Sequence, residues 1–222
     1  MNHIRLFLTL FCILFLVTGC TKVKREYYDT GRLKSETHHR FGKETGTTVY
    51  YHHWYPTKTM EVEMKRGKKN GKLTKRYFNG NVELIAYYKN DLLDGVETYY
   101  HKNGNRSMET HYTKGVKNGP VTTWYYNGGL KETGAFVNNL FDGKWENFDE
   151  RGLLTGEGLF EKGTGKRITY DYMGRLHSET NFVNNEKEGL EIYFTPSGEI
   201  EGTYLFKEDR IIKINGVPVE NL

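Results

Sequence analysis

Apolar and polar residues alternate along most of the chain, in segments of about six to nine residues that end at glycines. One set of glycines, the closing glycines, recurs at steps of 25, 24, 24, 24, 22 and 24 residues. The closing glycines are Gly46, Gly71, Gly95, Gly119, Gly143, Gly165 and Gly189. A second set, the middle glycines, comprises Gly31, Gly80, Gly104, Gly128, Gly152, Gly174 and Gly198. Segments this short suit β-strands rather than helices, so the pattern predicts tandem β-hairpins over residues 27–206.

Many of these glycines follow Asn or Asp, and such pairs favour tight hairpin turns. We therefore expect both sets of glycines to mark turns. One hairpin alone would be marginal, so neighbouring units must stabilise one another. After residue 206 the period ends, and alternation around Asn215-Gly216 predicts a last hairpin, residues 207–222, that covers the open edge.

Aligning the units places large aromatic residues at fixed positions in each one. Side chains two, six and eight residues after a middle glycine share one parity, so we expect them on one face of the sheet. Position five, mostly Glu or Thr, falls on the opposite face. The predicted aromatic stripe comprises Tyr100, Tyr112, Trp124, Phe136, Phe148, Phe160, Tyr170, Phe182 and Phe194. Either this stripe contacts a partner, or neighbouring rings, Lys stems and the curl of the sheet cover it. Trp54 and Trp145 lie off its columns and are predicted contact residues too.

The unit pattern YY-x-NG-x-L-K-x-E-x-x-Y-x-x-G-x-x-x-G resembles MORN repeats, specifically the bacterial variant of YwqK-type proteins. Val96–Gly119, Pro120–Gly143 and Lys166–Gly189 fit it best, and the resemblance covers almost all of the chain after the first 26 residues. The second unit departs most, because an insertion around Pro56 replaces its middle glycine. The resemblance implies an all-β fold: an elongated, twisted antiparallel sheet of about eight tandem hairpins, an open meander.

The first 20 residues, MNHIRLFLTLFCILFLVTGC, read as a secretory signal with an apolar run that is short for a membrane span. Their end, Leu16-Val17-Thr18-Gly19-Cys20, resembles the lipobox of bacterial lipoproteins, which implies cleavage after residue 19 and acylation of Cys20. The alternative is an ordinary signal peptide that contains a Cys. Residues 20–26 would form the lipidated tether, and Thr21 favours an outer membrane where one exists.

Composition and spacing argue against several kinds of chemistry. The formal net charge of +4 comes from 32 basic and 28 acidic residues, well short of a nucleic-acid-binding footprint. The glutamates repeat in equivalent surroundings, whereas catalysis needs one carboxylate that differs from its neighbours. His38-His39 and His52-His53 each offer one metal ligand per face, and GTGK at residues 163–166 lacks the full phosphate-loop pattern. We expect no enzyme activity, cofactor, metal, nucleic acid or small-molecule substrate.

These features favour a membrane-anchored lipoprotein of the bacterial cell envelope that binds or scaffolds a protein partner. The YwqK resemblance implies an alternative, an antitoxin or immunity protein that neutralises a toxin. That family role is cytoplasmic, which the signal and Cys20 contradict, so an immunity role would lie outside the cytoplasm. A third hypothesis is contact of the repeats themselves with envelope lipid or glycan.

Overall fold

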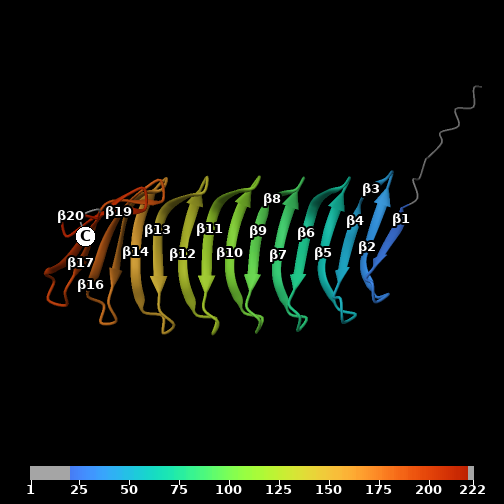
Figure 1. Cartoon of the computed structure of the whole chain (residues 1–222), viewed down its shortest axis with the longest axis horizontal. Helices are drawn as coiled ribbons and strands as arrows, with labels where there is room; N and C mark the ends of the chain where they lie inside the picture. The colour runs from blue at the N-terminus through green and yellow to red at the C-terminus, as the bar shows by residue number, and fades with distance from the viewer. Residues whose placement is uncertain (1–20, 220–222) are drawn as a thin grey trace, which may run out of the picture.

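The computed structural model describes residues 21–219, which form one open antiparallel sheet of 20 strands (Figure 1). The all-β prediction is confirmed. The strands are β1 Lys22–Tyr27, β2 Leu33–Arg40, β3 Lys43–Glu44, β4 Gly46–Tyr51, β5 Lys58–Lys65, β6 Lys68–Arg76, β7 Val82–Lys89, β8 Leu92–Leu93, β9 Gly95–Tyr100, β10 Arg106–Thr113, β11 Val116–Trp124, β12 Leu130–Val137, β13 Leu140–Phe148, β14 Leu154–Glu161, β15 Thr164–Tyr170, β16 Leu176–Val183, β17 Glu186–Phe194, β18 Ile200–Lys207, β19 Arg210–Ile214 and β20 Val217–Pro218.

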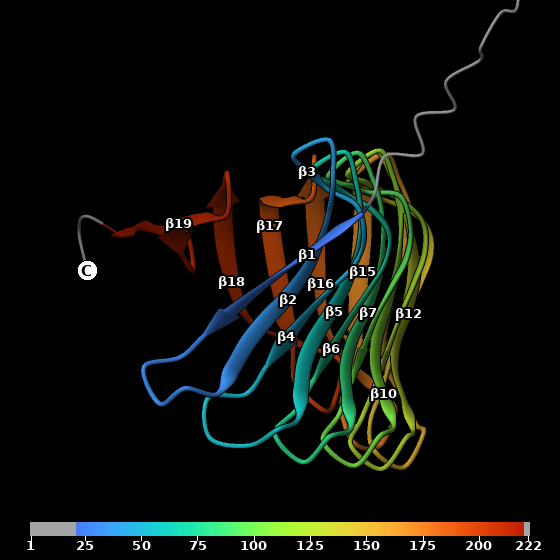
Figure 2. The ribbon, with the colours of Figure 1, turned by 90° about the vertical axis from the view of Figure 1, so that its right-hand side faces the viewer.

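Hairpins follow one another in chain order along the longest axis of the molecule (Figure 1). Strands are bowed rather than flat, and β16–β18 stand apart from the row formed by β5, β7 and β12 (Figure 2). Such curvature is expected, because open sheets of more than about ten strands rarely stay flat. Among residues 21–219 no helix is long and apolar enough to cross a bilayer.

The chain ends differ in part from expectation. Most of the predicted tether, residues 20–26, is strand β1, which pairs along its length with β2. Lysines and arginine dominate β1, and this keeps the open edge from pairing with another chain. At the other end, β19 and β20 form a short hairpin around Asn215-Gly216. Residues 1–19, the predicted signal, and Cys20 lie outside the described residues, as do residues 220–222.

The closing glycines do not mark turns, which corrects the sequence prediction. Gly119, for example, lies within β11 at a bulge in its pairing with β10. Its φ of 121° is a conformation that only glycine adopts readily. The turn precedes it, at Lys114-Gly115, where both residues have positive φ as two-residue hairpin turns require. A glycine with positive φ can make a bulge as readily as a turn, and the sequence does not separate the two.

The pairing register gives the sheet two faces, which we term the core face and the glutamate face. The core face carries Val62, Leu73, Ala86, Thr110 and Val121 in its central column, all buried. The glutamate face carries the glutamates of position five. Glu157, for example, lies opposite Glu146 on one neighbouring strand and Ile168 on the other. Buried side chains at equivalent positions of successive strands therefore form one column along the length of the sheet.

Candidate binding surface

The predicted aromatic stripe is split between the two faces, so the prediction of a single stripe is wrong. Tyr112, Phe136, Phe160 and Phe182 lie on the core face. Tyr100, Trp124, Phe148, Tyr170 and Phe194 lie on the glutamate face, because each stands three residues after a core-face residue on its own strand, as Trp124 does after Val121. The bulge next to each middle turn adds a residue to the following strand, so it reverses the parity of position two and not that of these rings.

Side-chain contacts agree with this assignment. The hydroxyl of Tyr170 donates a hydrogen bond to Glu157 Oε1 at 2.7 Å. The guanidinium of Arg106 lies 5.8 Å from the Trp124 ring and also pairs with Glu109. Both glutamates belong to position five, which faces away from Phe160 and its column. Trp124 and Tyr170 are therefore packed among charged side chains.

Trp145 is a core residue, which corrects the prediction that it contacts a partner. Only 2% of it is exposed, and its ring centroid lies 5.1 Å from that of Phe136 and 4.7 Å from that of Phe141. Glycines flank it on both neighbouring strands, and a Cβ on Gly134 would overlap the indole. Phe160 and Phe182 belong to the same buried cluster, so they are also packing residues.

Ion pairs cover much of the glutamate face. Lys166 pairs with Glu179 at 2.7 Å, and Lys144 lies between Glu146 and Glu157 at 2.7 and 3.6 Å. These side chains remain partly exposed, so solvent screens the pairs and each stabilises the fold only slightly. The repeated glutamates thus act as a solvated, cross-paired surface.

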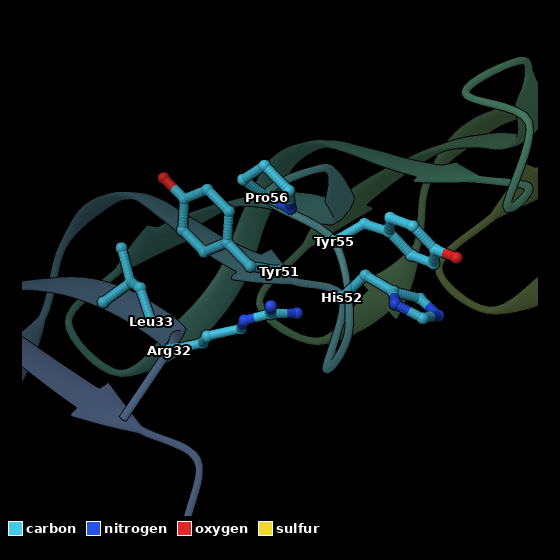
Figure 3. A pocket seen from close by; sticks show the side chains of 6 residues that line it. All are labelled: Arg32, Leu33, Tyr51, His52, Tyr55 and Pro56. Atoms are coloured by element: carbon cyan, nitrogen blue, oxygen red, sulfur yellow. The ribbon is translucent and has the colours of Figure 1, made fainter. Parts of the chain in front are cut away.

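The second unit departs from the others and forms a hollow of about 380 Å³ (Figure 3). Between β4 and β5 the loop of residues 52–57 replaces the glycine turn, and it is closed by a hydrogen bond from His52 N to Thr57 O at 2.9 Å. Arg32 of the preceding turn donates a hydrogen bond to the Trp54 carbonyl. The hollow is lined by Arg32, Leu33, Tyr51, His52, Tyr55 and Pro56.

Rings from three successive units gather around this loop. We term them the aromatic cluster: Tyr28, His52, His53, Trp54, Tyr55 and Phe78. Tyr55 and Phe78 stack edge to face with centroids 5.0 Å apart, and His53 lies 4.4 Å from both Tyr28 and Trp54. Trp54, Tyr55 and Phe78 are 61%, 50% and 66% exposed. Contiguous exposed rings of this kind mark interaction sites more often than isolated ones do.

The sequence identified Trp54 but not Tyr55 or Phe78. Phe78 lies in the next unit, 24 residues after Trp54, and reaches the loop only through the stacking of the hairpins. The insertion itself was the available signal, because it breaks the repeat within a run of six aromatic or histidine residues, Tyr50 to Tyr55.

Two of the hairpin units match a protein-family model. Residues 69–90 and 93–114 match the family model described as the MORN repeat variant. Two units are thus similar to the MORN repeat variant. They span β6 to β10 and include Phe78 of the aromatic cluster and the core-face rings Tyr88 and Tyr112.

No curated protein matches the chain. Two solved structures show weak likeness. One is a mutant of TarM from S. aureus in complex with Fondaparinux, alpha-GlcNAc-glycerol and UDP, at 15% identity and a TM-score of 0.24 over 60% of this chain. The other is a mutant Tc holotoxin pore of Photorhabdus luminescens, at 13% identity and a TM-score of 0.20 over 90%. This chain spans 22% of the first structure and 11% of the second.

The histidines considered as metal ligands make other contacts. His38 Nδ1 lies 3.0 Å from the Thr47 carbonyl, His39 Nε2 lies 2.9 Å from the Thr37 hydroxyl, and His52 and His53 belong to the aromatic cluster. Within residues 21–219 there is no group of three His, Cys, Asp or Glu side chains placed to hold a metal ion.

Within the two matched units, burial strongly changes the pKa of one tyrosine, Tyr112. Burial, and then the nearby charge of Glu97, raise the pKa of Tyr112 to about 12. A free tyrosine ionises near pH 10, so the folded state favours the neutral phenol. The stability that this provides is present below about pH 10 and is lost as the pH rises to about 12.

We expect Glu97→Gln to lower the pKa of Tyr112, because the substitution removes the carboxylate charge but leaves the ring buried. Absorbance at 295 nm, titrated for each chain with and without Tyr112→Phe, isolates this one phenol. Ionisation of Tyr112 near pH 10 in the unsubstituted chain would contradict the expectation.

Proposed function

We propose that this chain is a lipid-anchored binding module of the bacterial cell envelope, and that its aromatic cluster contacts a protein partner. The observation that supports the proposal is the exposure of Trp54, Tyr55 and Phe78, of which Tyr55 lines the hollow and Phe78 stacks on Tyr55. The hairpins are the scaffold, and the loop of residues 52–57 presents the rings.

The cluster has the composition of a protein contact site. Aromatic residues and Arg carry much of the binding energy in protein interfaces, where they fill pockets on the partner. Here the rings are held in place by edge-to-face stacking and by the hydrogen bond from Arg32, so little side-chain freedom is lost on binding. Apolar and proline-containing segments are the partners such a surface fits.

The anchor in this proposal is Cys20, acylated after removal of residues 1–19. Several acyl chains on one residue give stable membrane attachment, whereas a single chain is marginal. Strand β1 begins at Lys22, so the anchor would hold the first hairpin close to the bilayer. The outer membrane is the proposed destination where one exists.

Two substitutions test the anchor and the contact site separately. Cys20→Ala should release the chain from the membrane fraction and abolish its labelling by radioactive palmitate. Trp54→Ala combined with Phe78→Ala should leave labelling unchanged, and should reduce capture of the cross-linked partner from membranes at least tenfold, because hot-spot truncations each cost about 2 kcal/mol or more.

The matched control for the contact site is Tyr126→Ala with Tyr172→Ala. Both rings are exposed in the middle turns of later units, at Gly128 and Gly174, outside the aromatic cluster. Equal partner capture by the two double variants would overturn the assignment of the site, and a palmitate-labelled Cys20→Ala chain would overturn the assignment of the anchor.

A further inference from the structure

The turns that precede the closing glycines lie along one edge of the sheet, the upper edge in Figure 1, and their charge is uneven. The first two, residues 40–43 and 65–68, contain five basic residues and no acidic one. The six later turns together contain five basic and five acidic residues. These later turns are residues 89–92, 113–116, 137–140, 161–164, 183–186 and 207–210. Positive charge therefore collects at the N-terminal end of this edge.

The basic side chains of the first two turns are exposed, and within residues 21–219 none of them forms an ion pair. A hydrogen bond from Gly67 N to the Glu44 carbonyl, at 2.8 Å, holds the two turns side by side. Both turns line a hollow of about 390 Å³, formed by Arg40, Phe41, Thr45, Lys65 and Arg66. Unpaired cations around a hollow attract anionic groups.

Phe41, at the tip of the first turn, differs from its counterparts. The first central residue of all eight turns has a positive φ, between 46° and 54°. In the other seven it is polar or charged: Arg66, Asn90, Lys114, Asn138, Lys162, Asn184 and Glu208. Phe41 is 73% exposed, and the guanidinium of Arg40 lies 5.4 Å from its ring. A bulky residue is strained at positive φ and this ring is barely buried, so the fold does not account for it.

The described chain enters the sheet beside these turns. Strand β1 begins at Lys22, which pairs with His39, the residue before Arg40. The proposed anchor, Cys20, stands two residues before Lys22, and two residues of chain span at most about 7 Å. Acyl chains on Cys20 would therefore enter a bilayer next to the basic turns.

We propose that this corner of the sheet lies on the surface of a bilayer that contains anionic phospholipid. A basic patch beside an acyl chain supplies the second signal that stable attachment requires, and anionic headgroups attract its cations. Phe41 is placed to enter the boundary between headgroups and acyl chains, where exposed apolar rings are favoured. The corner lies outside the two matched units, residues 69–90 and 93–114. We term it the basic corner: Lys22, Arg40, Phe41, Lys43, Lys65, Arg66 and Lys68.

This inference rests on the anchored binding module proposed above and gives it an orientation. The eight residues of β5 connect the loop of residues 52–57 to the second basic turn. At about 3.4 Å per residue, β5 separates the aromatic cluster from the bilayer surface by up to about 27 Å. The basic corner would thus hold the aromatic cluster away from the membrane, where a protein partner can reach it.

Quenching by brominated phospholipid tests the position of the basic corner. The full Phe41→Trp chain, isolated from membranes, is bound to vesicles of brominated phosphatidylcholine and phosphatidylglycerol. Its emission is compared with that of the unsubstituted chain, which has the same three native tryptophans. The added emission should fall at least about twofold relative to vesicles without bromine, because position 41 lies at the headgroup boundary. Asn138→Trp is the matched control, since it occupies the same position of a later turn with a φ of 52°, and its added emission should not change.

The charges are tested on the same Phe41→Trp chain. Combining it with Arg40→Gln, Lys65→Gln and Arg66→Gln should return the emission to its value in vesicles without bromine. High salt, or omission of phosphatidylglycerol, should do the same, because both weaken attraction between exposed charges. These two conditions need no charge substitution, so they keep the test decisive if the combined variant fails to fold.

The control for the charges combines Lys114→Gln, Lys162→Gln and Lys207→Gln, which removes three cations from later turns and should leave the quenching unchanged. No quenching of the Phe41→Trp chain, equal quenching of the Asn138→Trp chain, or equal effects of the two charge variants would each overturn the proposal. Palmitate labelling and partner capture are measured separately. A palmitate-labelled chain that stays on vesicles without quenching would overturn the basic corner and leave the anchor standing.

Discussion

Replacing Trp145 by alanine is expected to lower the free energy of unfolding by about 3–5 kcal/mol, the range for large aromatic residues removed from a core. The indole is the largest side chain of the buried cluster and contacts Phe136 and Phe141. Glycines on both flanking strands leave the space that it fills, so alanine would open a cavity that no neighbouring Cβ can close. Urea unfolding followed by circular dichroism measures the loss.

Two matched variants show whether packing is the cause. Trp124→Ala removes the same side chain from the partly exposed glutamate face and should cost much less. Trp145→Phe should also cost less, because Nε1 of this indole has no hydrogen-bond partner within the described residues and only ring volume is lost. A loss for Trp145→Ala no larger than that for Trp124→Ala would contradict the placement of the core.

The contrast between these tryptophans shows what the sequence could and could not predict. Period, turn residues and segment length predicted an all-β array of hairpins, because they are local properties of the chain. The assignment of faces failed because it placed all the rings on one face. Along β11, alternation from buried Val121 puts Trp124 on the glutamate face, and an extra residue in β12, Lys131, lets Leu130 pair with it there. That bulge is a property of strand pairing, which the local pattern does not show.

The candidate sites were predictable to different extents. Trp54 stood out because the insertion breaks the repeat, whereas Phe78 joins it only through stacking across units. Glu97 lies two residues after its closing glycine, the repeat position of Leu73 and Val121, whereas the solvated glutamates stand at position five. Alignment of the units therefore contained a signal for its burial, which the sequence analysis did not use.

Asn185 shows how a change of spacing becomes a tertiary contact. The sixth closing glycine follows the fifth by 22 residues rather than 24, and the pairing of β14 with β15 lacks the bulge that β10 and β11 have after the corresponding turn. Asn185 reaches past this unit: its Nδ2 donates to the Asn139 carbonyl at 2.9 Å, and its Oδ1 accepts from Phe141 N at 2.7 Å. In other units the equivalent residue bonds only to the preceding turn, as Asn139 does to Lys117 N.

We therefore expect Asn185→Ala to cost about 2–3 kcal/mol, from two hydrogen bonds at roughly 1 kcal/mol each and the positive φ of the position. Asn139→Ala is the matched control, because it has nearly the same φ, 68° against 72°, but donates no side-chain bond across a unit. Asn185→Asp should fall between the two, since it keeps the acceptor for Phe141 N and loses the donor.

Hydrogen exchange shows which strands are destabilised by Asn185→Ala. Loss of the Asn185 contacts should increase amide exchange in β13 to β17, where the sheet leaves the row of earlier hairpins (Figure 2), and leave β5 to β9 unchanged. Neighbour contacts carry the stability of each unit in a repeat array, so a break here should stay local. Equal costs for Asn185→Ala and Asn139→Ala would show that the reach across the short unit contributes nothing to the fold.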